Sequence, residues 1–426
     1  MKRLLLYIMV LTAAALFISC TAPKNSNPVN PTGTPGENAG NNGGNNEAPS
    51  ESEIILKSLT PEEKIGQLII AGFPKDTSDD VIADYIDRYR IGGFIFFKDN
   101  FTDFESLYNL SSKLKSMNSA KSKLPLFISV DEEGGTVSRI PAGGTKFPDA
   151  QLVGKADNTS LTMKSGEVIG EELKAAGINL DFAPVLDIVT SSKNKLLLRR
   201  SYGSNPDIVS RHGIAFIKGI RSKDVIAVGK HFPGHGSTTT DSHSSLPVIN
   251  IGKDTLFSRE LVPFKRSISE GLDAIMVGHL SFPELEPSGA PATMSSYFLR
   301  DLLRNELGFQ GLAISDDLEM GGYLNAEGSF EEHVVTSFNA GMDIFVVGHT
   351  KEIQDRVLKA LTDAYNEGKI TEERLNESVL RIIDTKLKYK LSDSMTYSFE
   401  EARNHFGTKE HKAVLDEINK AIKAKI

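Results

Sequence analysis

Five residues with acid–base or cationic side chains lie between positions 230 and 243. They are Lys230, His231, His235, Asp241 and His243. A proline and two glycines among them disfavour a helix and indicate a shaped loop. Asp241 and His243 are two residues apart, so on a turned loop the carboxylate reaches the imidazole and stabilises its protonated form. Because an unperturbed imidazole has a pKa of about 6.5, the pair predicts a group that exchanges protons at neutral pH.

A second reactive group, Asp316, directly follows the apolar run at residues 312–315. A carboxylate in that place is a candidate nucleophile or base. Facing an acid–base group, it fits a retaining glycosidase, in which the carboxylate forms a covalent bond to the sugar. The acid would then be a histidine instead of the usual Asp or Glu.

Two other interpretations of the loop histidines stay open. Positions 231, 235 and 243 are spaced so that they could hold zinc, although a loop offers no helical face for the ligands and Lys230 would repel a cation. Alternatively, these histidines bind backbone groups alone. The single cysteine of the chain excludes a disulfide framework and a thiolate-based metal site. Neither a metal nor an organic cofactor is expected.

Short apolar runs recur along the chain with helical patterns between them. There are eight, at residues 67–73, 93–97, 126–130, 178–185, 225–230, 274–278, 312–315 and 343–348. Continuous apolar runs indicate strands buried on both faces, hence a parallel sheet, and their alternation with helices indicates βαβ units. Eight such units predict an α/β fold, a single (β/α)8 barrel. A doubly wound open sheet is the alternative.

A barrel would gather polar residues, because the catalytic side chains of such barrels lie at the carboxyl ends of the strands. Polar residues directly follow five of the runs, namely Asp131, Asp187, Lys230 with His231, His279, and Asp316 with Asp317. Alternation along a strand should point Asp316 and Asp317 in opposite directions, with Asp316 in the site.

Three neighbouring polar residues are left outside the predicted site. We expect Asp187 to be structural, orienting Lys230 or Arg200. His279 is either a contact at the rim or a core histidine. His235 is expected to organise the loop and not to catalyse.

The first twenty residues have the pattern of a targeting signal. Lys2 and Arg3 precede an apolar run at 4–18, and Ser19 and Cys20 follow it. This pattern is typical of a secretory signal peptide. The place of Cys20 resembles a bacterial lipoprotein signal, which predicts a signal peptide at 1–19 and lipidation of Cys20. Ordinary cleavage or an uncleaved anchor is the alternative.

The rest of the chain divides into three parts. Residues 20–52 are rich in Asn, Gly and Pro and predict a disordered tether between a membrane and the folded body. Residues 53–391 form the predicted barrel domain, with helices capped by Thr60 and Thr371. Residues 392–426 predict a helical extension whose Lys-rich end is solvated. The chain would therefore sit at the cell membrane or envelope, lipid-anchored outside the cytoplasm.

Composition narrows the classes of function. The 426 residues are 39% hydrophobic and 24% charged, which suits a folded body with a sizeable core. The formal net charge of −8 argues against a nucleic-acid partner. A monomer is expected.

Several motifs together resemble the family 3 glycoside hydrolases, in their β-N-acetylhexosaminidase branch. The resemblance rests on Asp-Glu-Glu-Gly-Gly at 131–135 with Arg139, Arg-Ser-Tyr-Gly at 200–203, the stretch at 230–236, Asp-Ser-His at 241–243, and Ser-Asp-Asp-Leu-Glu-Met at 315–320. The motifs stand in the family's order, and the block from 230 to 243 is specific to this branch. The family fold is a (β/α)8 barrel.

The resemblance implies a role for each matching residue. Asp316 would be the nucleophile, His243 the general acid and then base, and Asp241 its partner. The sugar would be bound by Asp131, Arg139, Arg200, Lys230 and His231. The implied activity is exo-β-N-acetylglucosaminidase, with peptidoglycan fragments or other glycans ending in β-linked N-acetylglucosamine as substrates.

One loop departs from the family pattern. Where members often have Asn-Pro-Val-Ile-Gly before the arginine, this chain has Asn-Lys-Leu-Leu-Leu-Arg-Arg at 194–200. Arg200 keeps the spacing from Asn194, and Arg199 competes with it. Rival functions are a phosphorylase that uses the same site, a glycan-binding lipoprotein without turnover, and a metal hydrolase.

Overall fold

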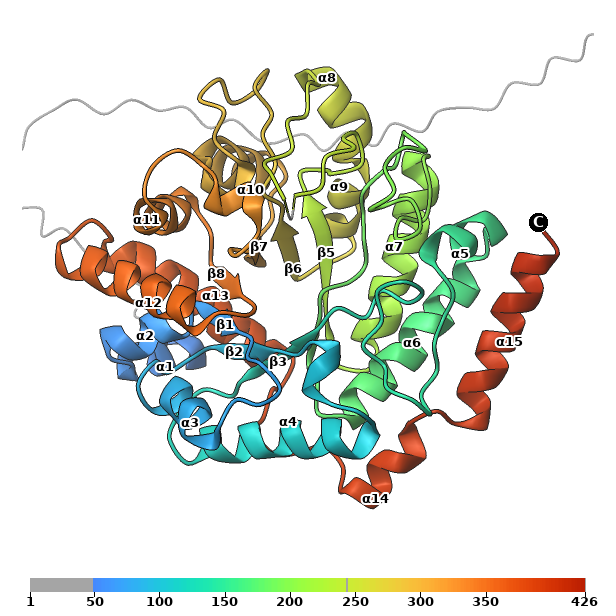
Figure 1. The fold of residues 1–426 in the computed structure, drawn as a ribbon, viewed down its shortest axis with the longest axis horizontal. Helices are drawn as coiled ribbons and strands as arrows, with labels where there is room; N and C mark the ends of the chain where they lie inside the picture. The colour runs from blue at the N-terminus through green and yellow to red at the C-terminus, as the bar shows by residue number, and fades with distance from the viewer. Residues whose placement is uncertain (1–48, 243, 426) are drawn as a thin grey trace, which may run out of the picture. The chain divides into compact units, whose positions relative to one another are not determined.

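Within residues 49–242 and 244–425, which the computed structural model describes, eight parallel strands close into a barrel (Figure 1). Each strand pairs with its neighbours in chain order, and β8 pairs back onto β1. The strands are β1 (Ile69–Ala71), β2 (Gly93–Ile95), β3 (Phe127–Val130), β4 (Leu180–Asp181), β5 (Ile226–Phe232), β6 (Ala274–Val277), β7 (Leu312–Asp317) and β8 (Ile344–Val347). All eight fall on the predicted apolar runs, so the predicted barrel is confirmed and the open sheet is wrong.

The strands have no polar face to turn to water, as is usual for a sheet in which all strands are parallel. Every strand residue is buried, apart from Asp316 and Asp317 at the end of β7. Helices cover the outside, which is the packing that parallel strands require. The predicted signal peptide, Cys20 and the tether up to residue 48 lie outside the described residues, as does His243.

Helices alternate with the strands around the barrel. They are α1 (Glu51–Ser58), α2 (Pro61–Gly66), α3 (Asp79–Asp87), α4 (Phe104–Ser119), α5 (Ala150–Ala156), α6 (Thr159–Ala175), α7 (Pro206–Arg221), α8 (Lys253–Thr255), α9 (Val262–Ser269), α10 (Gly321–Leu324), α11 (Phe330–Ala340), α12 (Lys351–Asn366), α13 (Glu372–Lys388), α14 (Phe399–Ala402) and α15 (Lys409–Lys423). Shorter or wider helical turns lie at η1 (Lys98–Asn100), η2 (Leu256–Glu260), η3 (Ala292–Met294), η4 (Tyr297–Glu306) and η5 (Arg403–His405). No helix among the described residues has the length and apolar character needed to cross a membrane.

Local sequence signals set several helix starts. Thr60 caps α2, and its side chain and that of Glu63 each accept a hydrogen bond from the other's backbone N–H, at 3.3 and 2.8 Å. Thr371 caps α13 by accepting from the backbone N–H of Arg374. The same device operates at Ser50, so that α1 begins at Glu51, before the predicted boundary at residue 53.

The C-terminal extension packs along the barrel's outer helices, beside α6 in Figure 1. The ring of Phe406 stacks on that of Phe104 with centroids 4.2 Å apart, and His411 Nδ1 lies 2.9 Å from Glu172 Oε1. Ile418 and Ile422 of α15 are buried. The prediction of a solvated terminal helix is therefore wrong for one face of α15, because the apolar residues there have a partner in the barrel wall.

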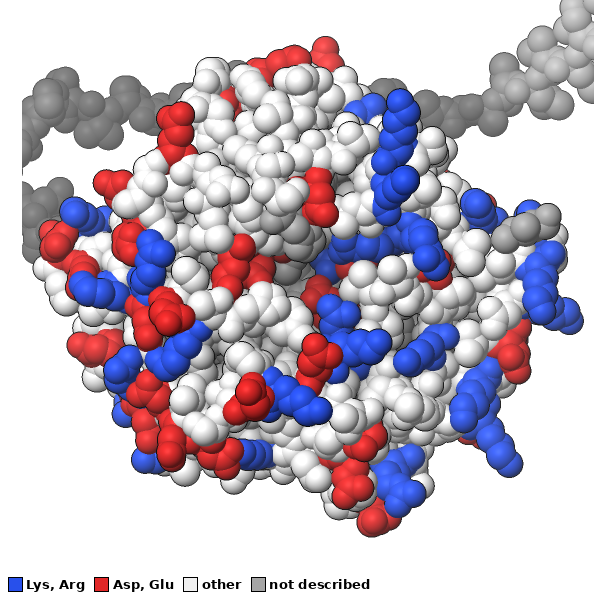
Figure 2. Space-filling model, viewed as in Figure 1, with Lys and Arg blue, Asp and Glu red and all other residues white. Residues whose placement is uncertain are grey.

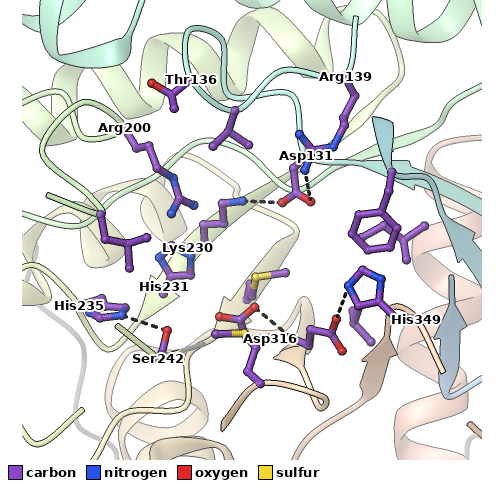
Figure 3. A pocket seen from close by; sticks show the side chains of 18 of the residues that line it. Asp131, Thr136, Arg139, Arg200, Lys230, His231, His235, Ser242, Asp316 and His349 are labelled. Atoms are coloured by element: carbon purple, nitrogen blue, oxygen red, sulfur yellow. Dashed lines mark hydrogen bonds and ion pairs between the residues drawn. The ribbon is translucent and has the colours of Figure 1, made fainter. Parts of the chain in front are cut away.

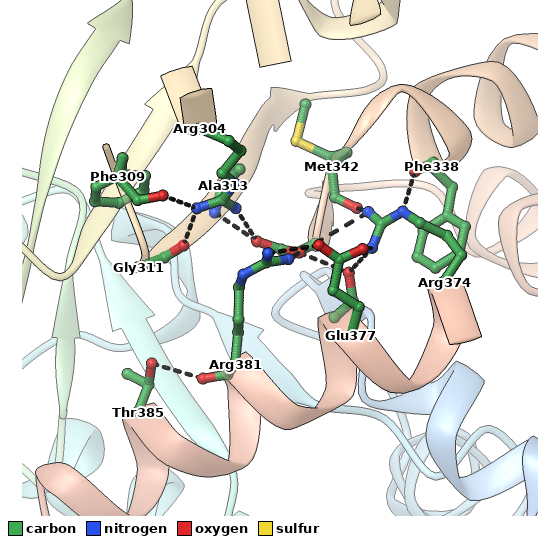
Figure 4. A network of polar contacts seen from close by, with 12 residues as sticks. Arg304, Phe309, Gly311, Ala313, Phe338, Met342, Arg374, Glu377, Arg381 and Thr385 are labelled. Atoms are coloured by element: carbon green, nitrogen blue, oxygen red, sulfur yellow. Dashed lines mark hydrogen bonds and ion pairs between the residues drawn. The ribbon is translucent and has the colours of Figure 1, made fainter. Parts of the chain in front are cut away.

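At the amino-terminal end of the barrel, a buried carboxylate ties several elements together (Figure 4). Asp343, just before β8, accepts hydrogen bonds from Arg304 Nη2 at 2.6 Å and from Arg381 Nη1 at 3.1 Å. It also accepts from Ser378 Oγ at 2.6 Å and from the backbone N–H of Ala313 at 3.0 Å. Burial alone would raise the pKa of Asp343, but the surrounding arginines hold it below its ordinary value. This charge network fixes α13 beneath β7 and β8, away from the pocket described next.

Candidate active site

A pocket of about 460 Å³ opens at the carboxyl ends of the strands. Its walls come from segments far apart in the sequence: Asp131 follows β3, Lys230 and His231 belong to β5, Asp316 is the penultimate residue of β7, and His349 follows β8. Figure 3 shows these side chains converging on one space. On the face seen in Figure 2, Lys and Arg side chains gather beside the central hollow, and Asp and Glu side chains lie mostly to its left and below it.

Six of the predicted site residues line this pocket. They are Asp131, Arg139, Arg200, Lys230, His231 and Asp316. Asp241 is exposed on the loop after β5, and the next residue, Ser242, lines the pocket. His243, the predicted acid, and Cys20, the predicted lipidation site, lie outside the described residues.

Asp316 has the environment of an ionised carboxylate. Its Oδ1 accepts a hydrogen bond from the backbone N–H of Asp317 at 2.9 Å. Burial favours the neutral form, but the facing His231 and His279, this hydrogen bond and Lys230 outweigh it and hold the pKa of Asp316 below its ordinary value. At neutral pH the side chain is therefore charged and able to act as a nucleophile.

Charges alternate along one wall of the pocket. Lys230 Nζ lies 2.7 Å from Asp131 Oδ1 and 2.7 Å from Glu133 Oε1, and Arg200 donates two 2.7 Å hydrogen bonds to Glu133. Arg139 Nη2 lies 4.0 Å from Asp131 Oδ2. Although burial opposes it, the two cations hold the pKa of Glu133 well below its ordinary value. The wall offers fixed donors and acceptors that suit the hydroxyl groups of a sugar.

Glu133 was missed from the sequence as a part of this site. It stands within the Asp-Glu-Glu-Gly-Gly motif at 131–135 but had no predicted role, and it is the buried counterion of both Lys230 and Arg200. A signal was present, because the predicted sugar-binding set has three cations, Arg139, Arg200 and Lys230, which need more negative charge than Asp131 supplies.

The competing arginines occupy different places. Arg200 lines the pocket, whereas the Arg199 side chain is 62% exposed and its Nε lies 2.7 Å from Asp149 Oδ2. The loop before them is anchored by Leu197, which is fully buried with Val185 and Val189. This anchoring turns Lys195 and Leu196 toward the pocket, and sequence reasoning predicted neither as a site residue.

Asp187 holds the loop after β5. Its Oδ2 lies 2.7 Å from His231 Nδ1, and its Oδ1 accepts from the backbone N–H groups of His231 at 3.3 Å and His235 at 2.7 Å. The expected structural role is thus met through His231, and not through a contact to Lys230 or Arg200. Gly236 lets this loop approach the segment that follows β4, since a Cβ at position 236 would lie 1.8 Å from the carbonyl oxygen of Ile188.

Two further histidines near the site, His235 and His279, hold neighbouring segments in place. His235 Nε2 lies 3.2 Å from Ser242 Oγ, which links the two ends of the loop. His279 is fully buried, with Nδ1 3.0 Å from Thr293 Oγ1 and Nε2 3.0 Å from the carbonyl oxygen of Asp317. Of the two interpretations left open for His279, the core histidine is the one observed.

The direction of the Asp317 side chain differs from the prediction. It was predicted to point away from Asp316, but both carboxylates line the pocket. The reason is a shift in register between β7 and β8 from Ile314 to Asp317, which breaks the alternation of side chains. Burial raises the pKa of Asp317 to about 6.

Zinc chemistry was one interpretation of the loop histidines. Among the described residues, no three His, Cys, Asp or Glu side chains are grouped so that they could hold a metal ion. Of the three histidines proposed as ligands, His231 already has Nδ1 in contact with Asp187.

Comparison with known proteins identifies similar chains. Residues 60–385 match the model of the glycosyl hydrolase family 3 N-terminal domain. A beta-hexosaminidase A from Pseudoalteromonas piscicida is 33% identical over 359 residues, which is 79% of this chain and 59% of that protein. The chain thus spans less than two thirds of that relative's length.

Two solved structures share the fold. A glycoside hydrolase family 3 beta-N-acetylglucosaminidase from Paenibacillus sp. str. FPU-7 is 37% identical with a TM-score of 0.80, covering 85% of this chain and 69% of that one. A beta-glucoside phosphorylase, BglX, is 26% identical with a TM-score of 0.78, covering 86% of this chain and 66% of that one.

Proposed function

The chain belongs to glycosyl hydrolase family 3 and is a glycoside hydrolase, and we propose that it is a retaining exo-β-N-acetylglucosaminidase. It would release terminal β-linked N-acetylhexosamine from peptidoglycan fragments or related glycans. One observation carries the proposal, namely an ionised Asp316 in the same pocket as the Asp131–Lys230 pair and the cation Arg200. The choice of an N-acetyl sugar as the substrate rests on the names of the similar proteins.

The proposed reaction has two steps. Asp316 attacks the anomeric carbon, and the bond from that carbon to the leaving oxygen breaks. Protonated His243, oriented by Asp241, gives its proton to that oxygen. His243 then takes a proton from water, whose oxygen attacks the anomeric carbon and frees Asp316.

The pocket residues have separate tasks in this scheme. Asp131 accepts hydrogen bonds from sugar hydroxyls, while Arg139, Arg200 and Lys230 donate without competing as bases. His231 lines the pocket between them and Asp316. No metal or organic cofactor enters either step.

We also propose that the protein is a monomer held at the cell envelope by a lipid on Cys20, outside the cytoplasm. The support is the sequence pattern at residues 2–20. Metabolic labelling with a radioactive fatty acid tests the anchor. Label in the wild type and its loss in Cys20→Ser are expected, and equal labelling of both would contradict it.

The activity is tested with the full-length chain in detergent. Release of the aryl group from the β-glycoside of N-acetylglucosamine is followed, with the β-glucoside in parallel, and the sugar product is identified with and without phosphate. Fast release of free N-acetylglucosamine that does not depend on phosphate is expected, with little turnover of the glucoside. Preference for the glucoside would contradict the proposed substrate, and no turnover would favour a glycan-binding protein.

A phosphorylase is the second candidate. Two observations favour it: the likeness to a beta-glucoside phosphorylase, and a pocket cation, Lys195, that has no ion pair among the described residues. Phosphate would then attack the anomeric carbon in place of water. The same experiment decides, because this reaction yields sugar 1-phosphate instead of free sugar.

A further inference from the structure

Two aromatic rings stack at the mouth of the pocket. The imidazole of His349, on the loop after β8, lies with its centroid 4.4 Å from that of Phe97, after β2, and the rings are inclined by 29°. Both line the pocket. The His349 side chain is 59% exposed, whereas that of Lys230 on the charged wall is 2% exposed. The pocket thus passes from a buried, charged interior to an exposed aromatic mouth.

The loop that carries His349 is fixed by carboxylates of β7 and the turn after it. Asp317 Oδ1 accepts from the backbone N–H of Gly348 at 3.1 Å, and Asp317 Oδ2 lies 3.6 Å from His349 Nε2. Glu319 Oε1 accepts from the backbone N–H groups of His349 at 2.9 Å and Thr350 at 2.7 Å. The imidazole therefore stands ready against Phe97 before any ligand arrives, which lowers the entropy lost on binding.

Core packing explains the position of Phe97, which packs against the barrel core, but it does not explain the position of His349. A side chain that leaves more than half of its surface in water gains little from burial, and the loop is already held through its backbone by Asp317 and Glu319. An exposed, preorganised aromatic face beside a nucleophile is instead suited to contact with a flat apolar ligand surface.

We propose that the Phe97–His349 stack is the contact surface for the leaving-group ring, that is, for a second pyranose linked to the terminal sugar. This inference rests on the proposed exo-glycosidase function. The hydrolysed sugar lies against the buried charged wall and Asp316, so the group that departs lies toward the exposed mouth. The C–H face of a pyranose is apolar and packs on the free face of the His349 ring.

Three variants test the role of the Phe97–His349 stack. His349→Ala removes the contact and moves the nearest aromatic surface back to Phe97, a retreat of one ring spacing. His349→Phe keeps an aromatic face without the imidazole nitrogens. The matched control is His405→Ala, because His405 stacks on Tyr397 at 4.3 Å and lies 3.0 Å from a carboxylate oxygen of Glu171, outside the pocket.

A pair of substrates isolates the contribution of a pyranose ring in the leaving group. N,N′-diacetylchitobiose and methyl β-N-acetylglucosaminide both have alkoxide leaving groups, but only the first has a leaving-group pyranose. We expect His349→Ala to lower the ratio of kcat/KM for the disaccharide over the methyl glycoside about fivefold. His349→Phe should keep the ratio within about twofold of the wild type, and His405→Ala should leave it unchanged.

Each outcome bears on one claim. An equal loss on both substrates in His349→Ala, or an unchanged ratio, would overturn the leaving-group contact. A fall in His349→Phe as large as that in His349→Ala would overturn stacking as its basis. If the wild type cleaves neither glycoside nor the aryl substrate, the proposed function itself fails, and this result is distinguishable because it appears before any variant is compared.

Discussion

Asp187 Oδ2 lies 2.7 Å from Nδ1 of His231, and the pair is almost completely buried beside the nucleophile. The negative charge makes Nδ1 the protonated nitrogen and leaves Nε2 for the pocket. Burial opposes the ionised form of Asp187, but His231 and His235 hold its pKa below its ordinary value. This carboxylate therefore sets the orientation of a ring that also keeps Asp316 ionised.

Replacing Asp187 by Asn should lower kcat/KM about tenfold to a hundredfold, because a neutral amide holds the imidazole less firmly and small misplacements are costly. The acid limb of the pH–rate profile should also move to higher pH as His231 lowers the pKa of Asp316 less. Circular dichroism and thermal unfolding check the fold. A profile superimposable on the wild type would show that Asp187 has no positioning role.

The neighbouring arginines give a matched pair of variants. Arg200→Ala removes a pocket cation and leaves buried Glu133 with Lys230 as its remaining ion-pair partner among the described residues, so KM should rise at least tenfold. Arg199→Ala breaks an exposed contact with Asp149 and should change kcat/KM less than threefold. Steady-state kinetics on the aryl glycoside decide between them. The reverse order would assign the sugar contact to Arg199.

Lys386 predicts a pH dependence of stability. It is buried with Nζ 2.6 Å from Gln67 Oε1, and desolvation lowers its pKa from 10.5 to about 7, against a weaker opposing effect of Asp393. Between pH 7 and 10 the unfolded chain therefore binds more protons at this site than the folded chain. The free energy of unfolding should rise with pH over this interval.

Lys386→Met removes this effect. Between pH 7 and 9, the wild type should gain about 2 kcal/mol of unfolding free energy relative to the variant. Urea unfolding at several pH values measures it, with Lys412→Met, an exposed lysine on α15, as the control. Parallel pH profiles for wild type and Lys386→Met would show that the buried amine stays protonated.

The fold was predictable because its signal is local. Each strand is a short apolar run, and the caps at Thr60 and Thr371 lie within three residues of their partners. A parallel sheet then follows from strands that are buried on both faces, and the number of βα units, eight, favours its closure into a barrel.

The site was predictable in part. Residues such as Lys230 and Asp316 lie near the carboxyl ends of strands, where the catalytic residues of (β/α)8 barrels are expected. Asp317 was misplaced because a register shift between two strands is not encoded in either strand alone. The charge of the predicted site called for a further carboxylate, but only the folded chain identifies it as Glu133, because Arg200 and Lys230 are distant from it in sequence. His349 was missed because its stacking partner, Phe97, is also distant in sequence.

The covalent bond between Asp316 and the sugar is the step on which the proposed reaction depends. It is tested most directly with a 5-fluoro N-acetylglucosaminyl fluoride, whose ring fluorine slows hydrolysis of the intermediate, followed by digestion and mass spectrometry of the labelled peptides. We expect one added sugar on the carboxylate of Asp316, and none in Asp316→Ala. Label on Asp317 or Asp131, or steady turnover with no labelled peptide, would contradict it.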